Sequence, residues 1–129
     1  DTLSNIEEVV GSAFNDVLTG DTLNNLFVGA AGNDAINGGD GTDTASYASS
    51  TAGVTVNLAT GTASDGFGDT DALSNIENVV GSSFNDTITG TAAANILSGG
   101  AGNDTITGNA GDDTIDGGLG SDRVNYITS

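Results

Sequence analysis

The sequence predicts an all-β protein, a parallel β-solenoid in which short strands alternate with glycine-rich turns. The first observation behind this prediction is a nine-residue period that runs over residues 11–46 and again over 81–125. The second is that every unit begins with glycine and carries Asp or Asn in the sixth place. The third is that the eighth place is apolar in every unit, as Leu18, Phe27, Ile36, Ala45, Ile88, Leu97, Ile106, Ile115 and Val124.

Each unit joins six turn residues to a three-residue strand such as Thr105–Thr107, in which polar, apolar and polar side chains alternate. Because side chains alternate across a strand, only the middle one points inward. So short a strand is not stable alone and must pair with copies of itself above and below. Two units, or 18 residues, are therefore expected to form one coil with a turn on each side, so that turns stack on turns.

A longer repeat contains the nine-residue units. Residues 1–20 align with 71–90 at an offset of 70, and later 38–50 aligns with 117–129 at an offset of 79. This duplication, in a chain that opens on Asp1 rather than Met, predicts a piece of a longer tandem array. We interpret the chain as a first run of repeats with its leading segment (1–46), a connector (47–70) and a second run with its leading segment (71–129).

The connector breaks the nine-residue frame. Val54, Val56 and Leu58 alternate there with polar residues, which predicts a longer strand. The apolar residues of the two leading segments are expected to form wider coils that join both runs into one continuous solenoid; they are Leu3, Ile6, Val9, Val10, Leu73, Ile76, Val79 and Val80. The alternative is a hinge between two separate rolls.

The charge of the chain indicates bound cations. Eighteen acidic residues face a single basic one, Arg123, and the net charge is −17. Such a chain cannot replace the cations around DNA or anionic lipid, so nucleic acid and anionic lipid are excluded as partners. No apolar run approaches the roughly 20 residues that a membrane-spanning helix needs. A disordered acidic chain is the alternative, but the acids occur in phase with the repeat.

The expected ion is calcium. Stacking places Asp beside Asp every ~4.8 Å, and one buried aliphatic side chain per nine residues is a small core for so much ordered backbone. A divalent ion shared between stacked turns would remove the repulsion and couple binding to folding. The chain has no His or Cys, so its ligands are oxygens, and flexible turn carbonyls suit Ca²⁺ better than the rigid octahedron of Mg²⁺.

Three units match the pattern GGxGxDxUx closely: GGDGTDTAS at 38–46, GGAGNDTIT at 99–107 and GGLGSDRVN at 117–125. In these residues the chain resembles the RTX, or haemolysin-type calcium-binding, family of secreted bacterial proteins. The resemblance covers 11–46 and 81–125. It implies a right-handed parallel β-roll with several calcium ions between its turns. It also implies a chain that is disordered without calcium and folds after export by type I secretion.

The resemblance further implies which residues bind the ions. The implied side-chain ligands are Asp86, Asp104 and Asp122 on one side of the second run with Asn95 and Asp113 on the other, and the pairs Asp16 with Asp34 and Asn25 with Asp43 in the first. The implied backbone ligands are Gly29, Ala31, Gly38, Asp40, Gly99, Ala101, Gly108, Ala110, Gly117 and Leu119. Phe14 and Phe84 replace the fourth-place glycine of the pattern, and Asn25 and Asn95 replace the sixth-place Asp. We expect these four turns to begin or cap each run, with weaker sites or none.

The connector has a further candidate site. Asp65, Asp69 and Asp71 follow one another at spacings of four and two residues in a polar turn. They are candidate ligands for one more calcium ion, and a solvated loop is the alternative.

The expected function is structural rather than enzymatic, because His and Cys are absent and the acids follow the repeat. The leading hypothesis is a calcium-folded segment of an adhesin, S-layer or filament array at the bacterial cell surface, with neighbouring copies or glycans as partners. The second is an accessory domain that carries a protease, lipase or epimerase through export. The third is an ice- or glycan-binding face built from outward-facing Thr87, Thr89, Thr105, Thr107 and Thr114.

Overall fold

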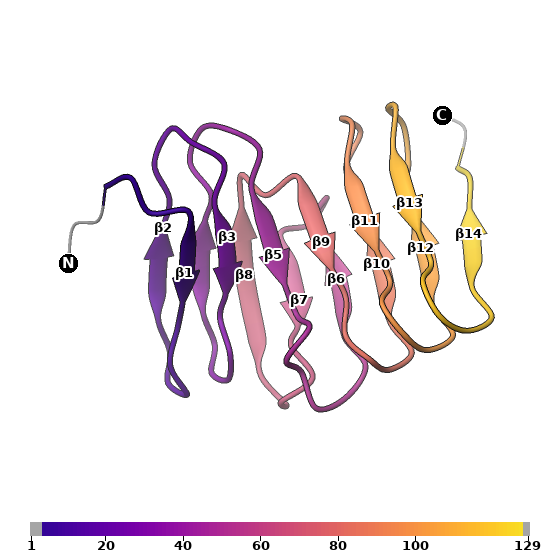
Figure 1. Cartoon of the computed structure of the whole chain (residues 1–129), viewed down its shortest axis with the longest axis horizontal. Helices are drawn as coiled ribbons and strands as arrows, with labels where there is room; N and C mark the ends of the chain where they lie inside the picture. Colours follow the sequence, from indigo (N-terminus) through magenta and orange to yellow (C-terminus); the bar gives the residue numbers. More distant parts are fainter. Residues whose placement is uncertain (1–3, 128–129) are drawn as a thin grey trace.

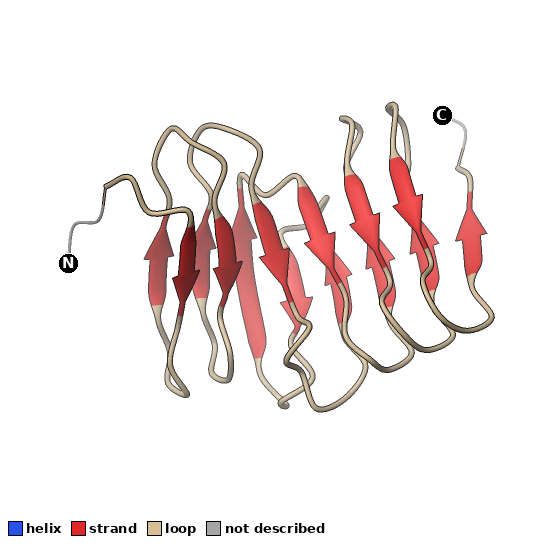
Figure 2. Cartoon of the chain, viewed as in Figure 1, coloured by secondary structure: helices blue, strands red, loops and turns tan. Residues whose placement is uncertain are grey.

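The computed structural model describes residues 4–127, in which all regular structure is strand and no helix occurs (Figure 2). The strands form two facing sheets whose turns stack along the molecule (Figure 1). The six-stranded sheet contains, in spatial order, β1 (Glu8–Val10), β3 (Leu26–Val28), β5 (Thr44–Ser46), β9 (Asn78–Val80), β11 (Ile96–Ser98) and β13 (Thr114–Asp116). The eight-stranded sheet contains β2 (Val17–Thr19), β4 (Ala35–Asn37), β8 (Thr70–Ser74), β7 (Thr62–Ser64), β6 (Thr55–Asn57), β10 (Thr87–Thr89), β12 (Thr105–Thr107) and β14 (Arg123–Asn125).

The nine-residue period produces a register of 18 residues, as expected for a β-roll. Ile88 of β10 pairs with Ile106 of β12, and Ile106 pairs in turn with Val124 of β14, all in parallel. Successive units alternate between the two sheets, so each coil contributes one strand to each sheet. The β-roll predicted from the sequence is confirmed by this arrangement.

Both runs of repeats belong to one continuous solenoid. In the six-stranded sheet, β5 of the first run pairs directly with β9 of the second, with Ala45 opposite Val79. In the eight-stranded sheet, β4 pairs with β8, and the connector strands then lead to β10.

The connector differs from its prediction. The expected longer strand at 54–58 is only the three-residue β6, and the five-residue strand is β8. β6, β7 and β8 form an antiparallel meander inside an otherwise parallel sheet. The chain reverses at Gly61 and at Gly66 and Gly68, whose positive φ angles of 69°, 80° and 110° are easy only for glycine. The alternation at 54–58 did not reveal this reversal.

The core is a thin layer of eighth-place residues from both sheets. Phe27, Ile88, Leu97 and Ile106 are fully buried, and Tyr47, Val54 and Ile76 extend the same cluster across the connector. The eighth-place residues of the end coils are more exposed to solvent, as at Val124. Ile6 and Val10 of the first leading segment are exposed, whereas Ile76 and Val79 of the second are buried between coils; Leu3 lies outside the described residues.

The threonines expected on one outward face belong to two different sheets. Thr87 and Thr105 are neighbours on the eight-stranded sheet, but Thr114 lies in β13 of the other sheet. Thr107 is buried. Consecutive units alternate between sheets, which is why threonines nine residues apart do not share a face. No helix of the described residues is long and apolar enough to cross a membrane.

A core substitution should show how much the thin interior contributes to the stability of the fold. Ile88→Ala is expected to lower the free energy of unfolding by about 2–5 kcal/mol with calcium present, because a fully buried aliphatic side chain is removed. Urea unfolding followed by circular dichroism measures the change. Ile115→Ala is the matched control, because Ile115 has the same place in its unit but is only partly buried. Equal losses would contradict a core centred on the inner coils.

Candidate metal sites in the stacked turns

The six-residue turns form two columns. One column precedes the strands of the eight-stranded sheet and holds turns 11–16, 29–34, 81–86, 99–104 and 117–122; the other holds 20–25, 38–43, 90–95 and 108–113. Within each column the backbone N–H of a sixth-place residue donates to the Oδ1 atom of the sixth-place Asp one coil on. These bonds run from Asp16 to Asp34 (2.8 Å), Asn25 to Asp43 (2.7 Å), Asp86 to Asp104 (2.8 Å), Asn95 to Asp113 (3.0 Å) and Asp104 to Asp122 (3.0 Å). The structure therefore places the sequence-predicted side chains in two ladders.

The turns fall into two classes, which differ in the residue at the fourth place of the unit. In five turns, which we call open, this place is glycine with a positive φ angle: Gly32, Gly41, Gly102, Gly111 and Gly120. The second place of the same turns also has positive φ, at Ala30, Gly39, Gly100, Asn109 and Gly118. In the other four turns, which we call capped, the fourth place is Phe14, Leu23, Phe84 or Ala93.

In the open turns a carboxylate oxygen is left without a partner. Asp34, Asp43 and Asp104 are at most 1% exposed, and the Oδ2 atom of each has no hydrogen bond. Each of these oxygens points at the first glycine of its own turn, where a methyl group would overlap it. Asp113 and Asp122 occupy the same place in the last coils, where they are less buried.

Backbone carbonyls converge on the same positions. A methyl group on Gly99 would overlap Asp104 Oδ2 and lie only 2.7 Å from the carbonyl oxygen of Gly117, one coil on. The carbonyls of Gly29, Gly38, Gly99 and Gly108 lie instead over the first glycines of the four capped turns. The other predicted backbone ligands, Ala31, Asp40, Ala101, Ala110 and Leu119, occupy the third place of the open turns. The carbonyl of Leu119 accepts a hydrogen bond from Gly102 N–H at 2.8 Å.

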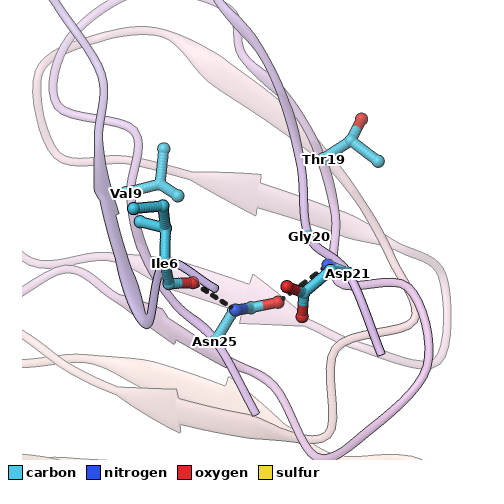
Figure 3. A pocket seen from close by; sticks show the side chains of 6 residues that line it. All are labelled: Ile6, Val9, Thr19, Gly20, Asp21 and Asn25. Carbon is cyan, nitrogen blue, oxygen red and sulfur yellow. Dashed lines mark hydrogen bonds between the residues drawn. The ribbon is translucent and has the colours of Figure 1, made fainter. Parts of the chain in front are cut away.

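In the capped turns the corresponding atom is already bonded. Asp16 Oδ2 and Asp86 Oδ2 each accept a backbone N–H, from Ser12 and Ser82, at 2.6 Å. Asn25 Oδ1 accepts the N–H of Asp21 at 3.0 Å, and its amide nitrogen donates to the carbonyl of Ile6 at 2.8 Å (Figure 3). Asn95 has the equivalent pair of bonds. Because an amide donates where a carboxylate cannot, the Asn turns are satisfied without an ion.

Three carboxylates of the open turns also have raised pKa values. Burial raises the pKa of Asp104, and the nearby charges of Asp86 and Asp122 raise it more, although the hydrogen bond from the Asp86 backbone opposes the shift. Burial likewise raises the pKa of Asp34 and of Asp43. The chain offers only Arg123 as a counter-charge. Buried carboxylates of this kind need a bound cation if they are to stay ionised.

The connector acids join the first column, with different roles. Asp71 takes the place of a sixth-place Asp, because its Oδ1 accepts the N–H of Asp34 at 3.0 Å. Its Oδ2 accepts the Tyr47 hydroxyl at 3.1 Å, and burial beside Asp34 raises the pKa of Asp71 to about 6. Asp65 is fully buried; its Oδ1 accepts the N–H groups of Phe67 and Asp69, whereas its Oδ2 has no partner. Asp69 Oδ2 accepts the N–H of Gly32 at 3.1 Å.

Sequence reasoning missed one acidic residue. Glu77 continues the second column, because its Oε2 accepts the N–H of Asp43 at 2.9 Å. The residue precedes the first glycine-initiated unit of the second run, but it lies nine residues before Asp86 and 18 before Asn95, in the phase of a sixth-place residue, and it ends the LSNIE segment that occurs twice in the chain; both were usable signals.

The donor set suits a hard cation that takes backbone ligands. Among residues 4–127 no three acidic side chains gather into a group able to hold a metal ion. An ion in the turns would therefore use carboxylates together with carbonyls. The unpartnered buried oxygens and the converging carbonyls of the open turns fit this requirement, and all are oxygen atoms of the type that calcium binds.

Comparison with known families gives one match. The model of the RTX calcium-binding nonapeptide repeat (4 copies) matches residues 10–45, 71–98 and 89–124, which together include all five open turns. No curated protein matches the sequence.

Proposed function

Because the chain belongs to the RTX calcium-binding nonapeptide repeat family, we propose that it is a structural segment of a larger secreted bacterial protein, and that it folds when it meets extracellular calcium. Calcium binding is the property of the family, and its repeats are typical of secreted bacterial proteins.

The observation that carries the proposal is the set of buried, unpartnered carboxylate oxygens in the open turns, at Asp34, Asp43 and Asp104. A chain with a net charge of −17 has a single basic side chain, Arg123, to set against all of its carboxylates. When bound, calcium would neutralise these carboxylates and connect one coil to the next. Without it, stacked neighbours within each ladder of acids would repel one another in a low-dielectric interior, and the thin core would not hold the coils together.

We expect the strongest site between turns 99–104 and 117–122, because both are open and the Asp104 carboxylate and the Gly117 carbonyl converge there. Elsewhere an open turn faces a capped turn, the connector or, at 38–43, the second leading segment. Asp16, Asn25, Asp86 and Asn95 would contribute little, since their second polar atom is bonded within its own turn.

A role in a tandem array agrees with the apolar surfaces at the two ends of the solenoid. The inward-pointing Leu18 of the first coils is only partly buried and Val124 of the last is 36% exposed, whereas Ile88 and Ile106 of the inner coils are fully buried. Neighbouring repeats stacked on these coils would cover such side chains. The proposed role is structural rather than catalytic, because the chain has no His or Cys and its acids serve the turns. An accessory domain of a secreted enzyme is the alternative, and a catalytic domain encoded in the same gene would identify it.

A calcium titration followed by circular dichroism tests the proposal. The purified chain should give a coil-like spectrum in chelator and a β-sheet spectrum once calcium reaches roughly 10⁻⁴–10⁻³ M, the range of extracellular calcium modules. Magnesium at the same concentrations is the control and should leave the coil unchanged, because it dehydrates reluctantly and requires a rigid octahedron. A chain that is folded in chelator would refute the proposal.

A further inference from the structure

The two runs of repeats meet at a place where no nonapeptide turn is present. In the six-stranded sheet β5 pairs with β9 at an offset of 34 residues, with Thr44 opposite Asn78, instead of 18. The open turn 38–43 therefore stacks on residues 75–77, which belong to the second leading segment. This contact carries the second column across the junction.

Glu77 acts there as a sixth-place Asp would. Its carboxylate Oε2 accepts the backbone N–H of Asp43 at 2.9 Å, just as Asp43 Oδ1 accepts that of Asn25 at 2.7 Å. The backbone N–H of Glu77 returns a bond to the carbonyl of Asp43 at 3.1 Å. The longer side chain of Glu compensates for a segment that lacks the turn geometry of the repeats.

Asn75 supplies a carbonyl at the same place. Its φ angle of +50° turns its backbone, and its carbonyl oxygen lies over Gly38 as that of Gly117 lies over Gly99. A methyl group on Gly38 would overlap both Asn75 O and Asp43 Oδ2. Asp43 is fully buried and this Oδ2 has no hydrogen bond, so two oxygens converge with one of them unsatisfied.

We propose that Asp43, Glu77 and the carbonyl of Asn75 form a calcium site that fastens the first run of repeats to the second. The inference rests on the proposed calcium-dependent folding and places an ion beside residues 72–77, which keep the nine-residue phase but lack the turn glycines of the nonapeptide pattern. The two carboxylates carry opposite charge to a divalent cation, and all three donors are hard oxygens. An ion bound here connects residues 34 positions apart and makes the two runs fold as one unit.

The test compares Glu77→Gln with Glu7→Gln by isothermal titration calorimetry with calcium chloride. Glu7 ends the first LSNIE segment, and its side chain is exposed. E77Q should bind one calcium ion fewer than the wild-type chain, and E7Q should bind the same number. Asp43→Asn should also lose the junction ion, and adding E77Q to it should remove no further ion, because both substitutions act on one site.

The outcomes separate this inference from the proposed function. If the wild-type chain binds no calcium, the proposed function fails. If the wild-type chain binds calcium but E77Q binds as many ions with the same affinity, only the junction site is refuted; an equal loss in E7Q refutes it as well. Should E77Q fail to fold, Glu77→Asp keeps the charge with a shorter reach and should weaken the affinity for one ion only. Unchanged affinity in that variant would overturn the site.

Discussion

Gly99→Ala is expected to raise the calcium concentration needed for folding by about tenfold or more, which corresponds to ~1.4 kcal/mol of lost binding energy. The new methyl group would overlap Asp104 Oδ2 and lie 2.7 Å from the Gly117 carbonyl oxygen, and these are two proposed ligands of one ion. Gly99 does not have a positive φ angle, so alanine adds no backbone strain there. The midpoint of a calcium titration followed by circular dichroism measures the effect.

Gly68→Ala is the control for Gly99→Ala, because it introduces backbone strain without steric crowding. Gly68 has a φ angle of +110°, but a methyl group there would meet nothing within 4 Å. Alanine should cost about 1–2 kcal/mol of stability through its backbone conformation and should leave the number of bound ions unchanged. If calorimetry counted as many calcium ions bound to Gly99→Ala as to Gly68→Ala, the oxygens around Gly99 would not be ligands.

The regular part of the fold follows from the sequence because the repeat is local. A single inward side chain per unit, as at Ile88 or Ile106, determines which residue of each strand points inward, and the coil of two units then requires a register of 18 residues. The same reasoning places Asp86, Asp104 and Asp122 in one ladder. Each of these predictions depends only on neighbours at a constant spacing.

The connector could not be predicted in this way, because the pairing of its strands depends on where the chain reverses its direction. Val54 and Val56 alternate with polar residues as in any half-buried strand, and the pattern does not distinguish parallel from antiparallel pairing. Asp71 takes a ladder position outside the nine-residue phase, and Glu77, which is in phase with Asp86 and Asn95, pairs across the connector with Asp43. Their roles depend on where β8 and β9 join the two sheets, which the spacing of residues does not encode.

The distinction between open and capped turns was visible in the sequence only in part. Phe14 and Phe84 depart visibly from the repeat pattern in its fourth place. Their consequence is local and geometric: without the positive φ angles of the second and fourth places, the turn brings Ser12 N–H or Ser82 N–H onto the carboxylate. Asp16 and Asp86 therefore align with the proposed metal ligands of the other repeats, but their Oδ2 atoms already accept hydrogen bonds within their own turns.

Asp104→Asn is expected to raise the calcium midpoint by about tenfold or more, because a hydrogen bond or ligand contact to a charged group contributes ~1.5–3 kcal/mol. Asp104 is 1% exposed, stands between two neighbours of its ladder and has one unpartnered oxygen. Asparagine keeps the shape and the Oδ1 acceptor for Asp86 N–H but removes the charge. Circular dichroism at increasing calcium measures the midpoint, and calorimetry should count fewer bound ions.

Asp16→Asn is the matched control, because Asp16 occupies the sixth place of a capped turn in the same column. Its Oδ2 is bonded to Ser12 N–H, and Asn25 and Asn95 already show that a capped turn accommodates asparagine with every polar atom of the amide bonded. The calcium midpoint of Asp16→Asn should therefore stay within about twofold of the wild-type value, or ~0.4 kcal/mol. Equal shifts in the two variants would mean that calcium does not distinguish open turns from capped ones, and that the fourth-place glycine serves the backbone alone.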